Sequence, residues 1–219
     1  MDRLESARSE ADAGTRYDRL APYYDRYITR LERRHVDRLV DDLELEPGET
    51  VLDVGCGPGT ALVTAGEQVG ADGTVVGLDL SAEMIDRARR RLEDRGFGDR
   101  ALLINGDARN MRHVADDSVD AVVSSFTLEL LSSTDRQTVL GECRRVLTSE
   151  GRLGALSLSR KDRLAVSLYD RLHRLRPDVF DCRPIDLVAA LERADFEIRA
   201  VRTESLYGLP VEGVVATPP

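Results

Sequence analysis

The sequence has few cysteines and no long apolar run, and each shortage excludes a class of protein. Its three cysteines, Cys56, Cys143 and Cys182, lie far apart in the sequence, and no two of them form a CxxC pair. This spacing argues against a disulfide framework and a zinc site. No run of about 18 apolar residues occurs, and the opening stretch MDRLESARSEADAG is charged where a secretory signal would be apolar. We therefore expect a soluble, cytoplasmic protein with reduced thiols and no integral membrane segment.

Basic residues are also in the minority. The chain has 40 acidic and 31 basic residues, for a formal net charge of −9, and Lys161 is its only lysine. Because a nucleic-acid binder needs a positive face toward the phosphates, this balance predicts no nucleic-acid partner. The acid excess is compatible both with a salt-adapted host and with a GC-rich genome.

The order of the predicted elements indicates the fold class. A chain of 219 residues with 42% hydrophobic residues is suited to one globular core. Apolar strands that alternate with helices form right-handed crossovers, which predicts an α/β fold with a doubly wound parallel sheet. Strands are expected at 49–54, 74–80, 101–106, 119–126 and 152–159, and helices near 60–69, 82–94 and 134–147.

The two ends of the chain depart from this alternation. Residues 1–46 form a polar leader with an amphipathic cover helix at about 28–43, and the main domain spans 47–219. After a helix at 185–194, the stretches FEIRAVRT and VEGVVATPP predict an antiparallel hairpin that closes one sheet edge. The insertion 160–187 is amphipathic, and we interpret it as an acceptor lid, with a dimer face or a membrane-surface contact as alternatives.

A glycine-rich turn follows the first predicted strand, in VLDVGCGPGT at 51–60. Gly55, Gly57 and Gly59 form GxGxG, and Thr60 stands where a dinucleotide-binding pattern has its last glycine. The carboxylate of Asp53 beside this turn would repel a pyrophosphate and attract a cation. S-adenosylmethionine meets that requirement, because it has an ammonium and a sulfonium group and no phosphate.

Acidic residues end the next two strands as well. Asp79 ends the second strand, where it could accept hydrogen bonds from both hydroxyls of a ribose, and Asp107 follows the third strand near the adenine position. Each acid has a structural alternative: Asp53 as a partner of loop amides, Asp79 as a cap of the helix that begins at Ser81, and Asp107 as a turn residue. Three acids at three successive strand ends favour an adenosine ligand.

These motifs together resemble the class I S-adenosylmethionine-dependent methyltransferases over residues 47–158. VLDVGCGPGT resembles their first motif, GLDLSAEMIDRAR their second-strand acid with its helix, and GDA their adenine-binding motif. DAVVSSFTLELL and RRVLTSEGRLGALSLS resemble the later strands, and the leader YDRLAPYYD resembles quinone C-methyltransferases and phospholipid N-methyltransferases. The resemblance implies a Rossmann-like, seven-stranded sheet whose last strand is antiparallel.

The resemblance also implies roles for individual residues. Gly55, Gly57 and Gly59 would line the methionine portion of S-adenosylmethionine, and Asp53 would support its amino end. Asp79 would bind the ribose. The remaining expected cofactor contacts are Met84 beneath the adenine, Asp107 and Ala108 at its edge, and Cys56, Leu80 and Ser124.

The methyl acceptor is expected to be a small molecule, quinone-like or lipid-related. The segment after the fourth strand, SSFTLELL, lacks the motif of methyltransferases that act on DNA bases, and no carboxylate trio for a metal is evident. The candidates for a catalytic role are Tyr24 in the leader and Glu129, which could instead be merely solvated. The alternatives are a non-catalytic S-adenosylmethionine-binding regulator and a nicotinamide-dependent oxidoreductase, and the protein is expected to be a monomer or a homodimer.

Overall fold

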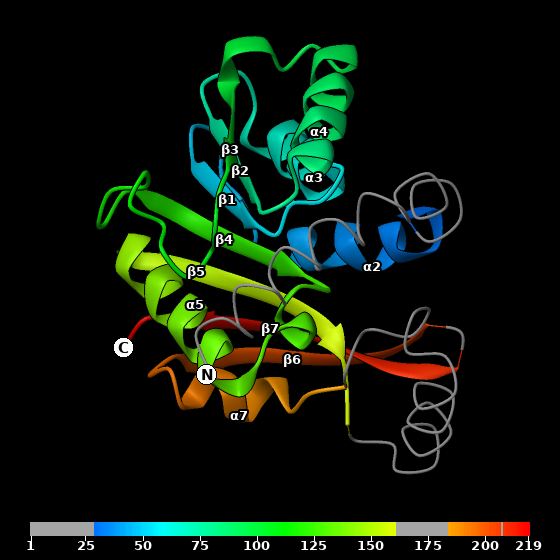
Figure 1. Cartoon of the computed structure of the whole chain (residues 1–219), viewed down its shortest axis with the longest axis vertical. Helices are drawn as coiled ribbons and strands as arrows, with labels where there is room; N and C mark the ends of the chain where they lie inside the picture. Colours follow the sequence, from blue (N-terminus) through cyan, green and yellow to red (C-terminus); the bar gives the residue numbers. More distant parts are fainter. Residues whose placement is uncertain (1–28, 161–183, 207) are drawn as a thin grey trace, which may run out of the picture.

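A mixed sheet of seven strands forms the centre of the computed structural model, which describes residues 29–160, 184–206 and 208–219. The strand order is β3-β2-β1-β4-β5-β7-β6 (Figure 1). Among the described strands, β7 alone runs opposite to the others, and it pairs antiparallel with both β5 and β6, which confirms the expected fold class and the terminal hairpin. The strands are β1 (Thr50–Val54), β2 (Thr74–Asp79), β3 (Ala101–Asn105), β4 (Val119–Ser125), β5 (Leu147–Leu158), β6 (Glu197–Leu206) and β7 (Leu209–Thr217).

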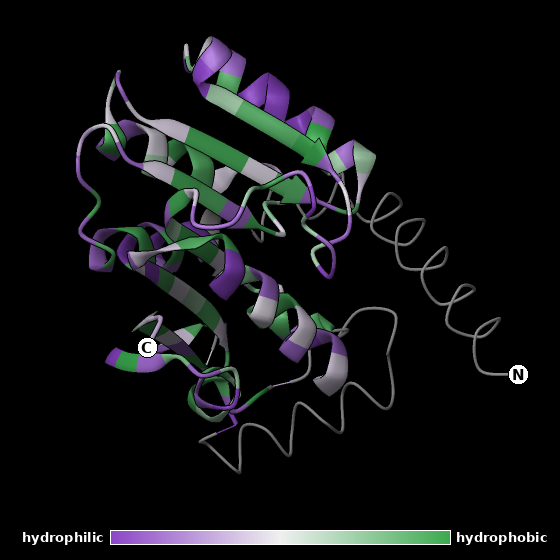
Figure 2. Ribbon diagram, turned by 90° about the vertical axis from the view of Figure 1, so that its left-hand side faces the viewer, coloured by the Kyte–Doolittle hydropathy of each residue, from purple (hydrophilic) through white to green (hydrophobic). Residues whose placement is uncertain are grey.

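Helices cover both faces of this sheet. Apolar side chains of α2, α3 and α4 form one core cluster with the sheet, and those of α5 and α7 form another on the opposite face. Figure 2 shows hydrophobic segments along the strands and hydrophilic ones on the helices, as expected for two buried sheet faces. The helices are α2 (Thr29–Asp42), α3 (Thr60–Val69), α4 (Ala82–Asp94), α5 (Ser133–Val146) and α7 (Leu187–Glu192), with short 3₁₀ turns η2 (Gly98–Arg100) and η3 (Leu128–Leu130).

Two element boundaries differ from the prediction. The strand expected from residue 152 begins at Leu147, because Leu147 pairs with Val119 before a register shift, after which Arg152 pairs with Ala121. The helix expected at 185–194 is the shorter α7, which begins after Asp186, whose side chain accepts a hydrogen bond from the Ala189 amide. Pairing across the sheet and side-chain capping decide both boundaries.

Parts of the predicted leader and insertion lie outside the described residues. These are residues 1–28, which include Tyr24, and residues 161–183. The helix predicted at about 28–43 is present as α2, and it packs into the same core cluster as α3; its covering role stays a prediction. Within the described ranges, no helix is long and apolar enough to cross a membrane.

The site lies where the order of the strands reverses. β1 pairs with β2 on one side and with β4 on the other, so the connections leave β1 and β4 toward opposite faces of the sheet. Loops after parallel strands separate at such a point and leave a crevice beyond their carboxyl ends. The glycine turn after β1, Asp79 at the end of β2 and the segment after β4 all border this crevice.

A polar network fixes α2 to the edge strand β6. Glu204 accepts hydrogen bonds from Arg38 and pairs with His35, and Arg202 pairs with Asp42. Burial raises the pKa of Glu204, but the hydrogen bonds from Arg38 and His35 outweigh burial and hold its pKa below the usual range. The ionised carboxylate therefore stabilises the packing of α2 against the sheet.

We expect Glu204→Gln to lower the free energy of unfolding by about 1 to 3 kcal/mol at neutral pH, because the variant loses charge-assisted hydrogen bonds to α2. A group whose pKa is depressed on folding stabilises the protein above its unfolded pKa, and this stabilisation is lost as the pH falls through the folded pKa. The difference from the wild type should therefore shrink in acid, which urea unfolding at a series of pH values measures. A difference that is constant down to the acid range would contradict this account.

Candidate functional site

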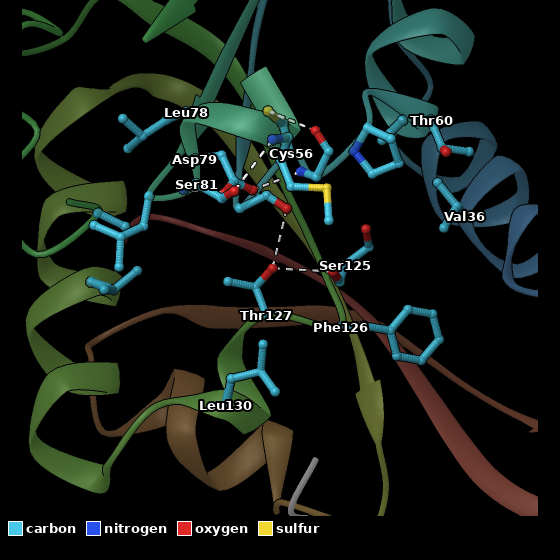
Figure 3. Close-up of a pocket in the computed structure, with 18 of the residues that line it drawn as sticks. Val36, Cys56, Thr60, Leu78, Asp79, Ser81, Ser125, Phe126, Thr127 and Leu130 are labelled. Carbon is cyan, nitrogen blue, oxygen red and sulfur yellow. Dashed lines mark hydrogen bonds between the residues drawn. The ribbon is translucent and has the colours of Figure 1, made fainter. Parts of the chain in front are cut away.

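A cavity of about 280 Å³ occupies the crevice beyond the carboxyl ends of β1, β2 and β4. Figure 3 shows Asp79 and Ser81 on one side of this cavity and Val36 and Phe126 on the other. The first part of its wall comes from the glycine turn and the ends of β2 and β3: Gly55, Cys56, Gly57, Pro58, Leu78, Asp79, Leu80, Ser81, Met84, Gly106, Asp107 and Ala108. The second part comes from α2, α3 and the segment after β4, and includes Glu32, Arg33, Val36, Thr60, Ala61, Ser125, Phe126, Thr127, Leu130, Leu131 and Val139.

The glycine turn bends over the end of β2. The amides of Gly55 and Cys56 both donate to the Leu78 carbonyl, at 2.8 and 3.0 Å. Gly55 has φ +74°, and a Cβ at this position would lie 2.3 Å from Thr127 Oγ1. Gly57 has φ +50°, but a Cβ there would have nothing within 4 Å. Gly55 is thus required by packing, whereas the absent side chain of Gly57 leaves room at the cavity.

Asp79 connects the glycine turn to the start of α4. Its Oδ2 accepts from the Gly57 amide and its Oδ1 from the Ser81 amide, both at 2.8 Å. The helix N-cap is Ser81, whose side chain accepts from the Met84 amide, so the alternative that Asp79 caps α4 is wrong. Each carboxylate oxygen has a second lone pair, so Asp79 can still accept hydrogen bonds from a molecule in the cavity.

Asp53 lies beneath the turn, outside the cavity wall. The residue is 1% exposed, and its Oδ1 has no hydrogen-bond partner within the described parts of the chain. Burial, and secondarily repulsion by Asp79, raises the pKa of Asp53 to about 8. Burial also raises the pKa of Asp79, against the lowering effect of the Ser81 and Gly57 amides. Because burial disfavours the ionised forms of both Asp53 and Asp79, a cation bound in the adjacent cavity would stabilise these ionised forms.

Asp107 borders the cavity but already has a strong partner. Arg109 Nε lies 3.1 Å from its Oδ1 and 2.9 Å from its Oδ2, and Nη2 lies 2.7 Å from Oδ2. The Asp107 Oδ1 also accepts from the Arg109 amide, as a turn residue does. Although burial raises the pKa of Asp107, the hydrogen bonds from Arg109 hold it below the usual range. The structure thus places an ionised, oriented carboxylate here.

Of the other predicted cofactor residues, some line the cavity and others lie behind its wall. Met84, Ala108 and the largely exposed Leu80 line the cavity, as does Cys56. Burial raises the pKa of the Cys56 thiol well above its usual range, so it stays protonated. Gly59 and Ser124 do not line the cavity; the Ser124 hydroxyl donates to the Val54 carbonyl and supports the turn from below.

The wall opposite Asp79 contains residues that the sequence analysis did not name. Phe126 has φ +53°, an uncommon backbone conformation for a bulky residue, and its ring lines the cavity (Figure 3). Glu32 and Val36 reach the cavity from α2. A signal for Glu32 was present in the sequence, because it stands four residues before Val36, on the apolar stripe that continues with Leu39, Val40 and Leu43.

Glu129 is 1% exposed, so the alternative that it is merely solvated is wrong. It belongs to η3, between Phe126 and Leu131 of the cavity wall, and it lies behind this wall. Its Oε1 accepts from the Leu158 amide at 3.3 Å, and its Oε2 has no partner within the described ranges. Burial raises the pKa of Glu129 to about 8, and the charge of Glu32 contributes to the increase.

The described residues contain no group of three or more His, Cys, Asp or Glu side chains that could hold a metal ion. The cavity instead combines carboxyl groups and a glycine turn at one end with a mainly apolar wall at the other.

Comparisons with known proteins identify the same region. The family model of a methyltransferase domain matches residues 51–151. The chain is 30% identical over 192 residues to the ubiquinone/menaquinone biosynthesis C-methyltransferase UbiE of Hahella chejuensis, covering 87% of this chain and 72% of that protein. It is 36% identical over 138 residues to the nocamycin O-methyltransferase of Saccharothrix syringae, covering 63% of this chain and 48% of that protein.

The fold has relatives among solved structures. A SAM-dependent methyltransferase from Aquifex aeolicus superposes with a TM-score of 0.65 at 23% identity, covering 86% of this chain and 92% of that one. The chain spans less than two thirds of the length of several curated relatives that it matches, including 36% of an uncharacterized transposon protein from Streptomyces fradiae.

Proposed function

Because this chain belongs to the class I S-adenosylmethionine-dependent methyltransferases, we propose that it transfers a methyl group to a small quinone-like or lipid-related acceptor. The observation that carries the proposal is the two-part cavity, with the glycine turn and Asp79 at one end and an apolar wall with Val36, Phe126 and Leu130 at the other. The first end suits the family's cofactor, S-adenosylmethionine, and the second suits an apolar acceptor.

The residues at the first end fit a cationic adenosine compound. In this proposal Gly55 and Gly57 line the space for the methionine portion, Gly59 lets the turn pack against Ala88 of α4, and Asp53 supports the ammonium group from below. The Oδ1 of Asp53, which has no hydrogen-bond partner among the described residues, and the open space beside Gly57 support this assignment. Asp79 would accept hydrogen bonds from the ribose hydroxyls. The adenine would contact Leu80, Met84, Asp107 and Ala108, while Cys56 completes the wall and Ser124 supports the turn from below.

The family's cofactor supplies, when bound, a methyl group on a sulfonium centre, which is a good leaving group. The protein therefore has to orient the acceptor for in-line displacement and to exclude water. Val36, Phe126, Leu130 and Leu131 provide apolar walls for this purpose. The leader with Tyr24 and the insertion 160–187 are proposed to cover the cofactor and the acceptor.

Relatives support the acceptor class. Besides UbiE, the demethylmenaquinone methyltransferase of Lactobacillus johnsonii is 29% identical over 174 residues, which cover 77% of this chain. Both names refer to quinone biosynthesis or a menaquinone precursor, and the apolar end of the cavity suits such rings. We further propose that the protein acts in the cytoplasm as a monomer or homodimer, without a nucleic-acid partner.

Thermal unfolding tests the cofactor. S-adenosylmethionine should raise the melting temperature, because a ligand that binds only the native state stabilises it by mass action, whereas NAD should leave it unchanged. A shift with NAD alone would support an oxidoreductase and refute the proposal. Transfer of labelled methyl from S-adenosylmethionine into a cell extract, followed by mass identification of the product, would identify the acceptor. Cofactor binding without transfer to any component would support a regulator instead.

Cofactor binding should also release protons, since a cation favours the ionised form of a nearby acid. The pKa of Asp53 is about 8 in the free protein, so binding at pH 7 should expel up to about one proton from it, and affinity should rise with pH until about 8. Calorimetry in buffers of different ionisation enthalpy measures this release. Asp53→Asn should release fewer protons than the wild type at pH 7. Equal release by both proteins would show that Asp53 does not sense the ligand.

A further inference from the structure

The cavity has a carboxyl group at its apolar end as well as at its cofactor end. Glu32 reaches the cavity from the first turn of α2, one helical turn before Val36, on the wall that also includes Phe126. It is half-buried, and burial raises the pKa of its carboxyl group to about 7. The mechanism outlined above gives this group no role.

A second carboxyl group lies behind the same wall. Glu129 is almost wholly inaccessible to solvent, and its Oε2 has no partner within the described ranges. The charge of Glu32 helps to raise the pKa of Glu129, so the two carboxyl groups lie within electrostatic reach of each other, whereas burial alone raises the pKa of Glu32. They come from segments almost a hundred residues apart in the chain, α2 and η3, which meet only through the fold.

Two arginines near the pair, Arg33 and Arg136, form their hydrogen bonds and ion pairs with groups other than Glu32 and Glu129. Arg33, beside Glu32 on α2, pairs with Asp37. Arg136 of α5 moderates the pKa of Glu129 through its charge, but its Nε and Nη2 donate to the carbonyls of Leu128 and Leu131. The pair therefore remains able to hold a proton.

We propose that Glu32 is the proton acceptor for a methyl acceptor that carries a phenolic or enolic hydroxyl group, beside a Glu129 that stays protonated behind the same wall. This inference rests on the proposed function and narrows its acceptor class. An ammonium-bearing acceptor is disfavoured, because the cofactor already brings a positive charge into the same cavity and would repel a second cation. A hydroxyl that loses its proton becomes an anion, which that positive charge attracts.

The step balances without a further reactant. The O–H bond of the acceptor breaks and its proton passes to the Glu32 carboxylate. An electron pair of that oxygen, or of the ring carbon conjugated to it, forms the bond to the methyl carbon, while the electron pair of the carbon–sulfur bond stays on sulfur. If a phenol is methylated at the ring carbon, the resulting dienone then loses the proton of that carbon to water and takes one on oxygen, which restores the aromatic ring. A base with a pKa near 7 suits such a transfer at neutral pH, where it is ionised in part and still basic. Release of the proton to water then restores Glu32.

Binding of two matched probes tests the proposal without catalysis. The probes are 2-naphthol, which has a hydroxyl, and 2-methoxynaphthalene, which does not, each titrated into protein saturated with S-adenosylhomocysteine. The wild type should bind 2-naphthol at least about tenfold more tightly than 2-methoxynaphthalene. Glu32→Gln should lose most of this preference, because the charge-assisted hydrogen bond is gone. Glu192→Gln, an exposed glutamate on α7, should behave as the wild type. Lack of preference in the wild type, or an undiminished one in Glu32→Gln, overturns the proposal.

The pH dependence of binding gives a second test. The preference for 2-naphthol should rise with pH through about 7 in the wild type, where Glu32 ionises. Glu129→Gln should keep this midpoint, because it replaces a protonated acid with a neutral amide of similar size. A preference in the wild type that does not change with pH through about 7 overturns the proposal. Calorimetry with S-adenosylmethionine on the wild type separates failure of the proposed function from failure of this inference. If the protein does not bind S-adenosylmethionine, the proposed function is refuted. If it binds S-adenosylmethionine normally but does not prefer the probe with a hydroxyl group, only this inference is refuted.

Discussion

Asp79→Ala should weaken S-adenosylmethionine binding roughly 30-fold to 1000-fold, or about 2 to 4 kcal/mol. The proposed hydrogen bonds from both ribose hydroxyls to this carboxylate are charge-assisted and contribute about 1.5 to 3 kcal/mol each, with imperfect additivity. Isothermal titration calorimetry measures the change. A 2′-deoxyribose analogue should be discriminated less by the variant, because the group that recognises the missing hydroxyl is absent.

The same variant should also lose stability, since Asp79 accepts from the Gly57 and Ser81 amides in the ligand-free protein. The unfolding midpoint therefore has to be measured on the same sample. Asp79→Asn retains one oxygen acceptor at similar size, and it separates the loss of charge from the loss of packing. Undiminished cofactor affinity in Asp79→Ala, together with a lower midpoint, would restrict Asp79 to holding the turn and would refute its ribose role.

Gly57→Val should abolish measurable cofactor binding, a loss of more than about 100-fold, while the fold stays intact. A Cβ at Gly57 would contact nothing within 4 Å, so the side chain finds open space, but this space belongs to the cavity that Gly57 lines. A β-branched residue at φ +50° is also strained, which costs about 1 to 3 kcal/mol of stability. Calorimetric affinity and circular dichroism on the same variant give the two quantities.

Gly96→Val is the matched control for that substitution. Gly96 has φ +75° and also nothing within 4 Å of a Cβ, but it does not line the cavity. It should show comparable strain with unchanged cofactor affinity. Gly55→Ala provides the opposite case, because its Cβ would lie 2.3 Å from Thr127 Oγ1 and the turn itself would have to move. Normal affinity in Gly57→Val would show that the turn does not contact the cofactor.

Much of the scaffold follows from local patterns in the sequence. The apolar strand runs, the helices between them and the terminal hairpin agree with the structure because hydrophobic periodicity and turn residues act over a few neighbours. Gly55 and Asp79 could be placed for the same reason: in a parallel α/β sheet, residues at successive strand ends meet at one edge. The family resemblance rested on these positions, and the comparisons agree with it.

The surroundings of some side chains at the site depend on packing between segments that are distant in the sequence. The sequence shows Asp53 beside the glycines, but only the fold places it beneath the turn with a raised pKa. The partner of Asp107 is local by contrast, because Arg109 stands only two residues further along the chain, but only the structure shows that the two side chains pair.

The apolar end of the cavity, where we propose that the acceptor binds, was decided almost entirely by tertiary structure. Glu32 belongs to a helix that precedes the glycine motif, and its side chain becomes part of the cavity only because α2 packs against the sheet beside α3. In the sequence Glu129 is a polar residue that follows a strand. In the structure it belongs to η3, accepts a hydrogen bond from the Leu158 amide and is buried. Burial and charge–charge distance are properties of the assembled chain, so the sequence determined the sheet and the glycine turn, and the fold alone decided which carboxyl groups lie at or behind the apolar end of the cavity.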